Sequence, residues 1–115
     1  MAKVNLYLIE LSSDDEQFYK IGTSVHRYCR FYEIMKHGYS VTITYMLFGL
    51  EFHNALDAES MLQKRFQYNQ YMPDKKFGGY TECFKYFDIT LYKQIVNELF
   101  PEPKEIVQNL TISWR

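Results

Sequence analysis

The first two apolar segments of the chain carry the pattern of a β-hairpin. Residues 4–11 are apolar almost throughout and rich in strand formers, and residues 18–21 have the same character. The polar residues 12–16 separate the two runs. Two short apolar runs joined by a polar turn are typical of neighbouring antiparallel strands.

The pattern then changes to that of a helix followed by a third strand. Between residues 24 and 37, apolar side chains recur at spacings of three and four: Val25, Tyr28, Cys29, Tyr32 and Met35. Ser24 is a suitable N-cap for this helix, and Gly38 stands just past its end. Residues 39–48 alternate between apolar and polar side chains, which predicts a half-buried strand.

A carboxylate interrupts the apolar face of the next predicted helix, residues 54–66. This face holds the residues at i, i+4, i+7 and i+11: Ala55, Glu59, Leu62 and Phe66. A charged carboxylate that faces a core is costly unless it is paired, bound to a metal or placed at the mouth of a cleft. Either Glu59 is such a group, or the helix is rotated so that Glu59 lies at the margin of the stripe and pairs with Lys64 or Arg65.

The remaining chain predicts a loop, a strand, a helix and a tail. Residues 67–79 are polar and aromatic and end in two glycines, so they form either a segment that closes over a substrate or an ordinary surface loop. Residues 80–87 have strand character, and Asp88 is placed to cap a last helix that stops before Pro101. Residues 104–115 form a tail, an added edge strand or a dimer contact.

Length and composition indicate one domain. The chain has 115 residues, of which 47% are hydrophobic, enough for one core and too few for two ordinary domains. We expect residues 1–100 to form an α/β (α+β) domain, with a small, mainly antiparallel central sheet flanked by helices, and residues 101–115 to form a C-terminal tail or edge element. Neither a run of eighteen apolar residues nor the apolar core of a signal peptide occurs, which predicts an intracellular protein without a membrane partner.

Charge and cysteine usage exclude two classes of function. Thirteen basic and fourteen acidic residues give a net charge of −1, unlike the basic excess of strong non-specific DNA binders. A local basic surface is still predicted between residues 20 and 37: Lys20, His26, Arg27, Arg30, Lys36 and His37. Cys29 and Cys83 lack the spacing of a zinc or redox motif and are interpreted as reduced thiols.

The end of the second predicted strand has the features of a phosphate site. The sequence Tyr-Lys-Ile-Gly-Thr-Ser occupies residues 19–24, and Arg30 follows on the predicted helix. Gly22 lets the backbone approach a ligand closely or take a positive φ. Small residues and a guanidinium on one edge suit a phosphate group.

The order of these motifs resembles that of the GIY-YIG nuclease superfamily, in its divergent branch from phages and large viruses. The matching motifs are the strand with Tyr7, the strand with Lys20-Ile21-Gly22-Thr23-Ser24, the helix with Arg30, the helix with Glu59, and Thr81-Glu82-Cys83-Phe84. They cover about the first ninety residues. Arg30 lies eight residues after Gly22, the spacing found in that family.

The resemblance implies a GIY-YIG-like nuclease domain that hydrolyses DNA phosphodiester bonds with Mg²⁺ or Mn²⁺. Tyr7 matches the tyrosine of the first motif, and Gly22 matches the glycine of the second. Arg30 matches the phosphate-binding arginine, and Glu59 matches the ligand of one divalent metal. We expect Ser24 and Arg27 to contact the DNA beside them.

Both motifs depart from the family pattern. The first reads Asn5-Leu6-Tyr7, and the second reads Lys20-Ile21-Gly22, with its tyrosine one position upstream at Tyr19. Either Lys20 takes over the work of that tyrosine, or a register shift restores Tyr19, or the site has lost its chemistry and kept a binding groove. Glu82 either lies at the site or pairs with Lys85 or a helix end.

Two functions stay open at this stage. The first is a metal-dependent endonuclease that acts as a homodimer or gains DNA affinity from a protein partner, in the host cytoplasm if the chain is viral. The alternative is a non-catalytic binding protein of the same fold that engages a host protein or a defence complex. The altered motifs, the near-neutral charge and the eleven tyrosines, a residue type enriched at interfaces, favour this alternative.

Overall fold

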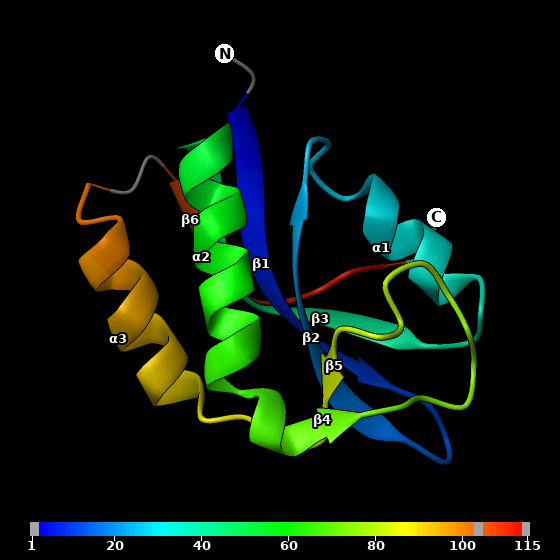
Figure 1. Ribbon diagram of the computed structural model, residues 1–115. Helices are drawn as coiled ribbons and strands as arrows, with labels where there is room; N and C mark the ends of the chain where they lie inside the picture. Colours follow the sequence, from blue (N-terminus) through cyan, green and yellow to red (C-terminus); the bar gives the residue numbers. More distant parts are fainter. Residues whose placement is uncertain (1–2, 103–104, 114–115) are drawn as a thin grey trace.

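A six-stranded antiparallel sheet runs through the centre of the computed structural model, which describes residues 3–102 and 105–113 (Figure 1). Its strand order is β4-β5-β2-β1-β3-β6. The strands are β1 (Lys3–Ser12), β2 (Gln17–Ser24), β3 (Ser40–Glu51), β4 (Gln70–Tyr71), β5 (Cys83–Phe84) and β6 (Glu105–Thr111). The helices of the described chain are α1 (Cys29–Met35), α2 (Phe52–Arg65), α3 (Ile89–Leu99) and the 3₁₀ helix η1 (Gln67–Asn69). The predicted α+β class with a central antiparallel sheet is confirmed.

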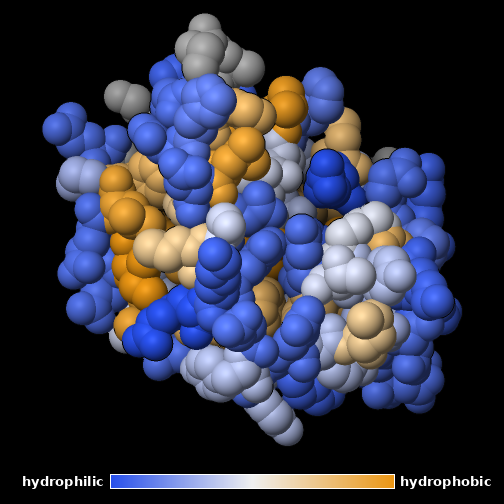
Figure 2. Space-filling model, in the orientation of Figure 1, coloured by the Kyte–Doolittle hydropathy of each residue, from blue (hydrophilic) through white to orange (hydrophobic). Residues whose placement is uncertain are grey.

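The two faces of the sheet have separate cores because successive side chains of a strand point to opposite faces. On one face, Leu6, Leu8 and Ile21 pack against Leu62 of α2 and Tyr92 of α3. In the space-filling view of this side, apolar residues reach the surface mainly over α3 (Figure 2).

The opposite face is covered by α1 and by the segment between β4 and β5. We call this segment, residues 72–82, the strap. Tyr7 and Ile9 of β1 pack here with Phe31 of α1 and Phe77 of the strap. The rings of Tyr7 and Phe31 meet edge to face, with centroids 5.0 Å apart.

The predicted hairpin is present, with Tyr7 of β1 directly opposite Gly22 of β2. Its second strand is longer than predicted, since Ser24 pairs with Asn5 as the last residue of β2. The prediction that Ser24 caps a helix over residues 24–37 is therefore wrong. Strand pairing overrides the capping preference of the serine, and bends occupy residues 25–28 before α1 begins.

The buried face of α1 also differs from the predicted one. Phe31 and Ile34 are its buried residues, whereas Cys29 is exposed. Val25, which was predicted to lie on the apolar face of this helix, precedes it and is 65% exposed. Apolar residues do recur at spacings of three and four in this segment. In so short a helix, more than one set of residues has this spacing, so the spacing did not identify the buried face.

The later elements agree with the sequence in type and differ in extent. Glu51 caps α2 by accepting a hydrogen bond from the backbone N–H of Asn54 at 2.9 Å. Asp88 caps α3, as predicted, by accepting one from Leu91 at 3.0 Å. The strand predicted over residues 80–87 is wrong in length, because pairing is confined to β5.

The C-terminal segment belongs to the sheet. β6 pairs with β3 along its outer edge, so these residues form an edge strand. Residues 1–2 of the predicted domain and residues 103–104 and 114–115 of the predicted tail lie outside the described residues. Among the helices of the described chain, none has the length and apolar character needed to cross a lipid bilayer.

Candidate active site

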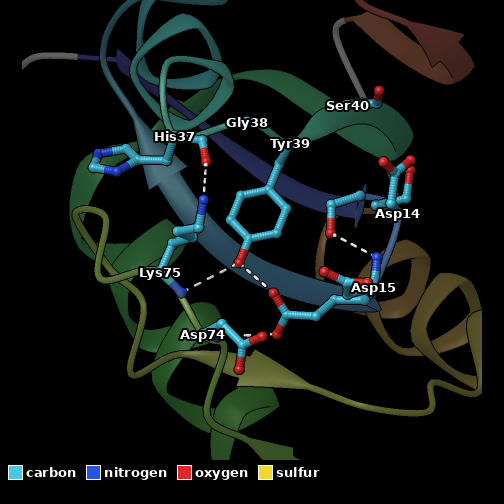
Figure 3. A pocket seen from close by; sticks show the side chains of 11 residues that line it. Asp14, Asp15, His37, Gly38, Tyr39, Ser40, Asp74 and Lys75 are labelled. Carbon is cyan, nitrogen blue, oxygen red and sulfur yellow. Dashed lines mark hydrogen bonds between the residues drawn. The ribbon is translucent and has the colours of Figure 1, made fainter.

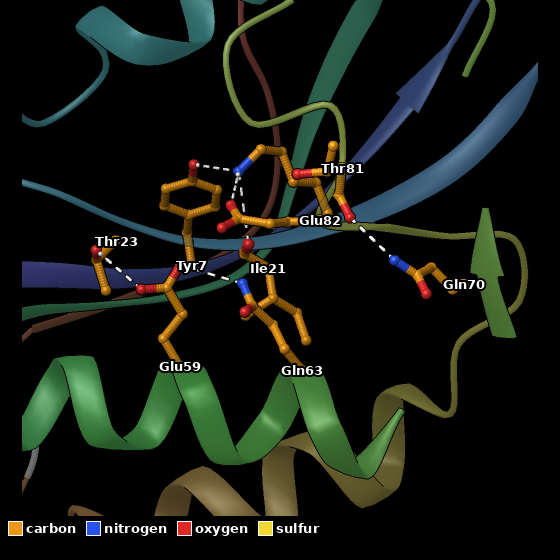
Figure 4. A network of polar contacts seen from close by, with 9 residues as sticks. Tyr7, Ile21, Thr23, Glu59, Gln63, Gln70, Thr81 and Glu82 are labelled. Atoms are coloured by element: carbon orange, nitrogen blue, oxygen red, sulfur yellow. Dashed lines mark hydrogen bonds and ion pairs between the residues drawn. The ribbon is translucent and has the colours of Figure 1, made fainter. Parts of the chain in front are cut away.

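The candidate site lies where β2 loses its outer neighbour. β5 pairs only with Tyr19 and Lys20, so residues 21–24 have no strand partner on that side within the described chain. An unpaired strand edge leaves backbone groups free and lets side chains from both faces of the sheet meet around it. Glu59 of α2 reaches this edge from one face and Tyr7 from the other (Figure 4). Lys20 lies with Tyr7, because its Nζ is 3.1 Å from Tyr7 Oη.

The centre of the site is a buried ammonium group. Lys20 is 1% exposed, and its Nζ donates to Tyr7 Oη at 3.1 Å, to Glu82 Oε1 at 3.4 Å and to the carbonyl oxygen of Ile21 at 3.5 Å. These three acceptors match the three N–H groups of an ammonium. Burial alone would lower the pKa of Lys20, but the Tyr7 hydroxyl and the Glu82 carboxylate raise it, so the group is charged.

Two glycines make room for this ammonium. A Cβ atom at Gly22 would lie 2.4 Å from Tyr7 Oη and 2.9 Å from Lys20 Nζ. A Cβ atom at Gly79 of the strap would lie 2.6 Å from Lys20 Cε, and Gly79 also has a φ of +83°. Gly22 is thus required for close approach to side chains of its own chain, while Gly79 is required for both approach and conformation.

Glu59 is half-buried and has two neutral hydrogen-bond donors. Thr23 Oγ1 donates to its Oε1 at 3.3 Å, and Gln63 Nε2, one turn further along α2, donates to its Oε2 at 3.2 Å (Figure 4). Among the described residues, no cation forms an ion pair with Glu59, so of the two alternatives left open by the sequence the pairing with Lys64 or Arg65 is wrong.

The pKa of Glu59 is raised, first by burial and then by the negative charge of Glu82. Lys20, the Thr23 hydrogen bond and Arg30 act in the opposite direction without cancelling the shift. The carboxylate therefore lies in surroundings that favour an added positive charge. Glu82, for its part, pairs with Lys20 instead of with Lys85 or a helix end.

Arg30 flanks this cluster from α1. Its side chain is exposed, and its charge is close enough to lower the pKa of Glu59. Arg30 also lines a cavity of about 650 Å³ beside α1, together with Ser24 at the end of β2. The structure thus brings Tyr7, Lys20 and Glu59 together and places Arg30 at their side.

Two predicted substrate contacts lie elsewhere. Tyr19 points to the face opposite Lys20, where its ring packs 5.8 Å from that of Phe87. Arg27 pairs with Glu105 of β6, and its guanidinium lies 4.0 Å from the centre of the Phe48 ring. Neither side chain contacts the cluster. The alternation of side chains along β2 explains the first result, and the arrival of β6 beside β3 explains the second.

The donor set fits a hard divalent cation held by few protein ligands. The described residues contain no group of three or more His, Cys, Asp or Glu side chains that could enclose a metal. Glu59 offers carboxylate oxygens that have no ion-pair partner in the part of the chain that the structure describes, with the charge of Glu82 nearby. Mg²⁺ takes oxygen ligands and usually keeps several waters, so one carboxylate with water and phosphate oxygens is a suitable site.

A second buried carboxylate, which the sequence placed in a polar turn, fixes the strap. Glu16 is 8% exposed and accepts hydrogen bonds from Tyr39 Oη at 2.5 Å, from Tyr71 Oη, and from the backbone N–H of Asp74 at 2.9 Å. Tyr39 and Asp74 lie side by side in Figure 3, and together with Glu16 they line a cavity of about 430 Å³. The strap is therefore held closed over Lys20 by contacts that the sequence pattern did not show.

Sequence reasoning also missed the two residues that hold Glu59. Gln63 follows Glu59 by four positions, the helical spacing at which side chains meet, and this signal could have identified it. Thr23 stood within the motif but had no assigned role. A comparison of the chain with protein-family models, with curated proteins and with solved structures returned no match, so the resemblance to GIY-YIG nucleases stays a prediction.

Proposed function

We propose that this chain is a metal-dependent endonuclease that hydrolyses phosphodiester bonds of DNA. The observation that supports this most strongly is the pairing of opposite electrostatic demands at one edge of β2. Among the described residues, the half-buried Glu59 carboxylate has no ion-pair partner, while the exposed guanidinium of Arg30, which has none either, lies beside it. A metal ion together with the phosphate it binds satisfies both demands at once.

Each residue has a distinct part in this proposal. Glu59 would hold Mg²⁺ or Mn²⁺, with Thr23 and Gln63 fixing its orientation. When bound, the metal supplies charge stabilisation and lowers the pKa of a coordinated water. Arg30 has no ion-pair partner among the described residues and would contact phosphate oxygens through its planar fork.

Tyr7 and Lys20 act as a unit. The Tyr7 hydroxyl accepts a hydrogen bond from Lys20, and the Tyr7 side chain is fully buried, so Tyr7 would act from beneath the site by holding Lys20 in place and not by touching the phosphate itself. All three N–H groups of Lys20 have acceptors, so Lys20 acts through its charge. This arrangement favours Lys20 over Tyr19 as the functional replacement in the second motif.

The test is relaxation of a supercoiled plasmid with Mg²⁺ or Mn²⁺, and with EDTA as the metal-free control. We expect nicking by the wild type only with metal, and its loss in Glu59→Gln. Glu98→Gln, an exposed glutamate of α3, is the matched control and should cut at the wild-type rate. If Glu59→Gln cuts DNA at the wild-type rate, the assignment of Glu59 as the metal ligand is wrong. If the wild type cuts neither plasmid nor single-stranded DNA, the binding-protein alternative is favoured.

A further inference from the structure

The cavity beside α1 has the size and the lining of a ligand site. Its volume of about 650 Å³ falls within the range of small-molecule sites, roughly 300–1,000 Å³. The end of β2, the bends after it, α1 and Gly78 of the strap contribute to its wall. Arg30 belongs both to this wall and to the flank of the candidate active site, so the two are adjacent.

A buried hydroxyl in this wall has no hydrogen-bond partner. Ser24 is 7% exposed, and its Oγ is unpartnered among the described residues. Buried polar groups are nearly always hydrogen-bonded, and each exception calls for an explanation. Ser24 lines the cavity, and its buried Oγ lies just behind the wall, where a small shift of the wall would let a polar atom of a ligand become the missing partner.

The side chains of the wall include hydrogen-bond donors, hydrogen-bond acceptors, flat rings and an apolar surface. Arg30 is a donor, and Glu33 is an acceptor whose negative charge opposes a bare phosphate in the cavity. His26 and His37 present imidazole rings, and Ile34 presents an apolar surface. Donors, acceptors and a stacking surface in one cavity match the edge and the face of a nucleobase.

We propose that this cavity receives one unpaired nucleobase of the DNA strand whose phosphate Arg30 holds. The inference rests on the proposed nuclease function and adds the class of substrate to it. A base inside an intact duplex must leave its stack before it enters such a cavity, whereas a base in a single strand, a frayed end or a branch is already available. The preferred substrate is therefore DNA with unpaired nucleotides.

Cys29 offers a direct probe of the occupied cavity. It is exposed and lines the cavity, whereas Cys83, the other cysteine of the chain, is buried. The rate of Cys29 alkylation by N-ethylmaleimide is measured by mass spectrometry in EDTA, where no metal-dependent cleavage occurs. A short mixed-sequence single strand at about ten times its dissociation constant is expected to slow alkylation about tenfold, and loss of one stacked base is expected to weaken binding about tenfold.

The matched competitors are a strand of equal length built from abasic sugar phosphates and the fully paired duplex. The abasic strand carries the same backbone charge as the single strand, and the duplex carries about twice that charge, but neither has an accessible base, so we expect each to protect Cys29 about twofold or less. Equal protection by the abasic strand would show that only phosphates are bound and would overturn the inference. Absence of protection by the single strand would overturn it as well.

A pair of variants in the strap provides the second test. A Cβ atom at Gly78 would meet nothing within 4 Å, so both Gly78→Ala and Gly78→Phe fit the backbone, and the phenylalanine ring takes up cavity space. We expect Gly78→Phe to weaken single-strand binding in EDTA about tenfold and Gly78→Ala to leave it unchanged. Equal binding by the two variants would refute the assignment of the cavity.

These measurements separate the two proposals because none of them depends on cleavage. Base-dependent protection of Cys29 in a protein that never cuts DNA would refute the nuclease function and keep the base site. Metal-dependent cleavage without base-dependent protection would refute the base site and keep the nuclease. Ser24→Ala tests binding separately from folding. It removes a hydroxyl that has no partner among the described residues, so it should weaken single-strand binding without loss of thermal stability.

Discussion

The Lys20–Glu82 pair leads to an asymmetric prediction for stability. The side chain of Lys20 is 1% exposed and that of Glu82 is 40% exposed. Glu82→Gln leaves a buried ammonium without its counter-charge. Lys20→Met instead leaves a carboxylate that water already reaches, and it fills the vacated space with an unbranched apolar side chain.

The size of the difference follows from these exposures. Removing one partner of a fully buried ion pair costs about 3–5 kcal/mol, and an exposed pair is worth about 0–1 kcal/mol. Because Glu82 is partly solvated, we expect Glu82→Gln to lower the free energy of unfolding by about 2 kcal/mol. This is a fall of roughly 8 °C in Tm for a domain of this size. For Lys20→Met we expect a change within about 1 kcal/mol.

The assay is urea denaturation at neutral pH in EDTA. Lys36→Met and Glu33→Gln are matched controls, since these residues form an exposed pair on one helical turn, and neither change should matter. The loss in Glu82→Gln should persist up to the usual lysine pKa of 10.5 and shrink only as the pH rises through the raised folded pKa of Lys20, because a neutral amine needs no counter-charge. A Lys20→Met protein that is less stable than Glu82→Gln would refute this reasoning.

Four further outcomes are expected. In EDTA, Glu59→Gln should be more stable than the wild type, and the difference in stability should appear as the pH rises above about 4.5. The reason is that burial, and then the charge of Glu82, raise the folded pKa of Glu59. Thermal melts from pH 4 to 7 measure the difference, and a difference that does not change with pH would contradict this reasoning. Glu16→Gln should lower the free energy of unfolding by about 2 kcal/mol at pH 7, since burial would raise the pKa of Glu16 but its three hydrogen bonds lower it. This loss should vanish as the pH falls through the lowered pKa. A variant with wild-type stability at pH 7 would show that other contacts hold the strap. Gly22→Ala should lower Tm, because its Cβ displaces the buried Tyr7 ring. The folded fraction should cleave on the order of a hundredfold more slowly, and a wild-type kcat would count against the Tyr7 role. Arg30→Lys should lose most cleavage with unchanged melting, because lysine keeps the charge and not the planar fork, and full activity would reduce Arg30 to a surface charge.

Local periodicity predicted the elements whose own residues carry a clear hydrophobic pattern. The hairpin, the strand after residue 39 and the helix that carries Glu59 all follow from spacing in the sequence. Glu59 itself was visible as a charged residue on an apolar face. The start of the first helix was mispredicted because residues up to Ser24 pair with β1. Local residue spacing does not reveal such long-range strand pairing.

The role of Glu16 could not be predicted for the same reason. A glutamate in a polar turn is expected to be solvated, and its partners Tyr71 and Asp74 lie more than fifty positions later. Its burial depends on the path of the strap, which carries no periodic pattern. The arrangement of Lys20 between two glycines is likewise a property of the packed chain, because Gly79 reaches it from the strap.

The edge strand β6 has a consequence for folding during synthesis. β1, β2 and β3 are complete once about fifty residues have been made, whereas β6 reaches its partner β3 only about sixty positions later. Until then the outer edge of β3, a long strand that is mostly buried in the native sheet, offers unpaired backbone groups to other chains. A nascent or truncated chain without residues 105–111 is therefore the species most prone to aggregate, and deleting this mostly exposed strand should reduce the yield of dispersed protein far more than its small share of the core suggests.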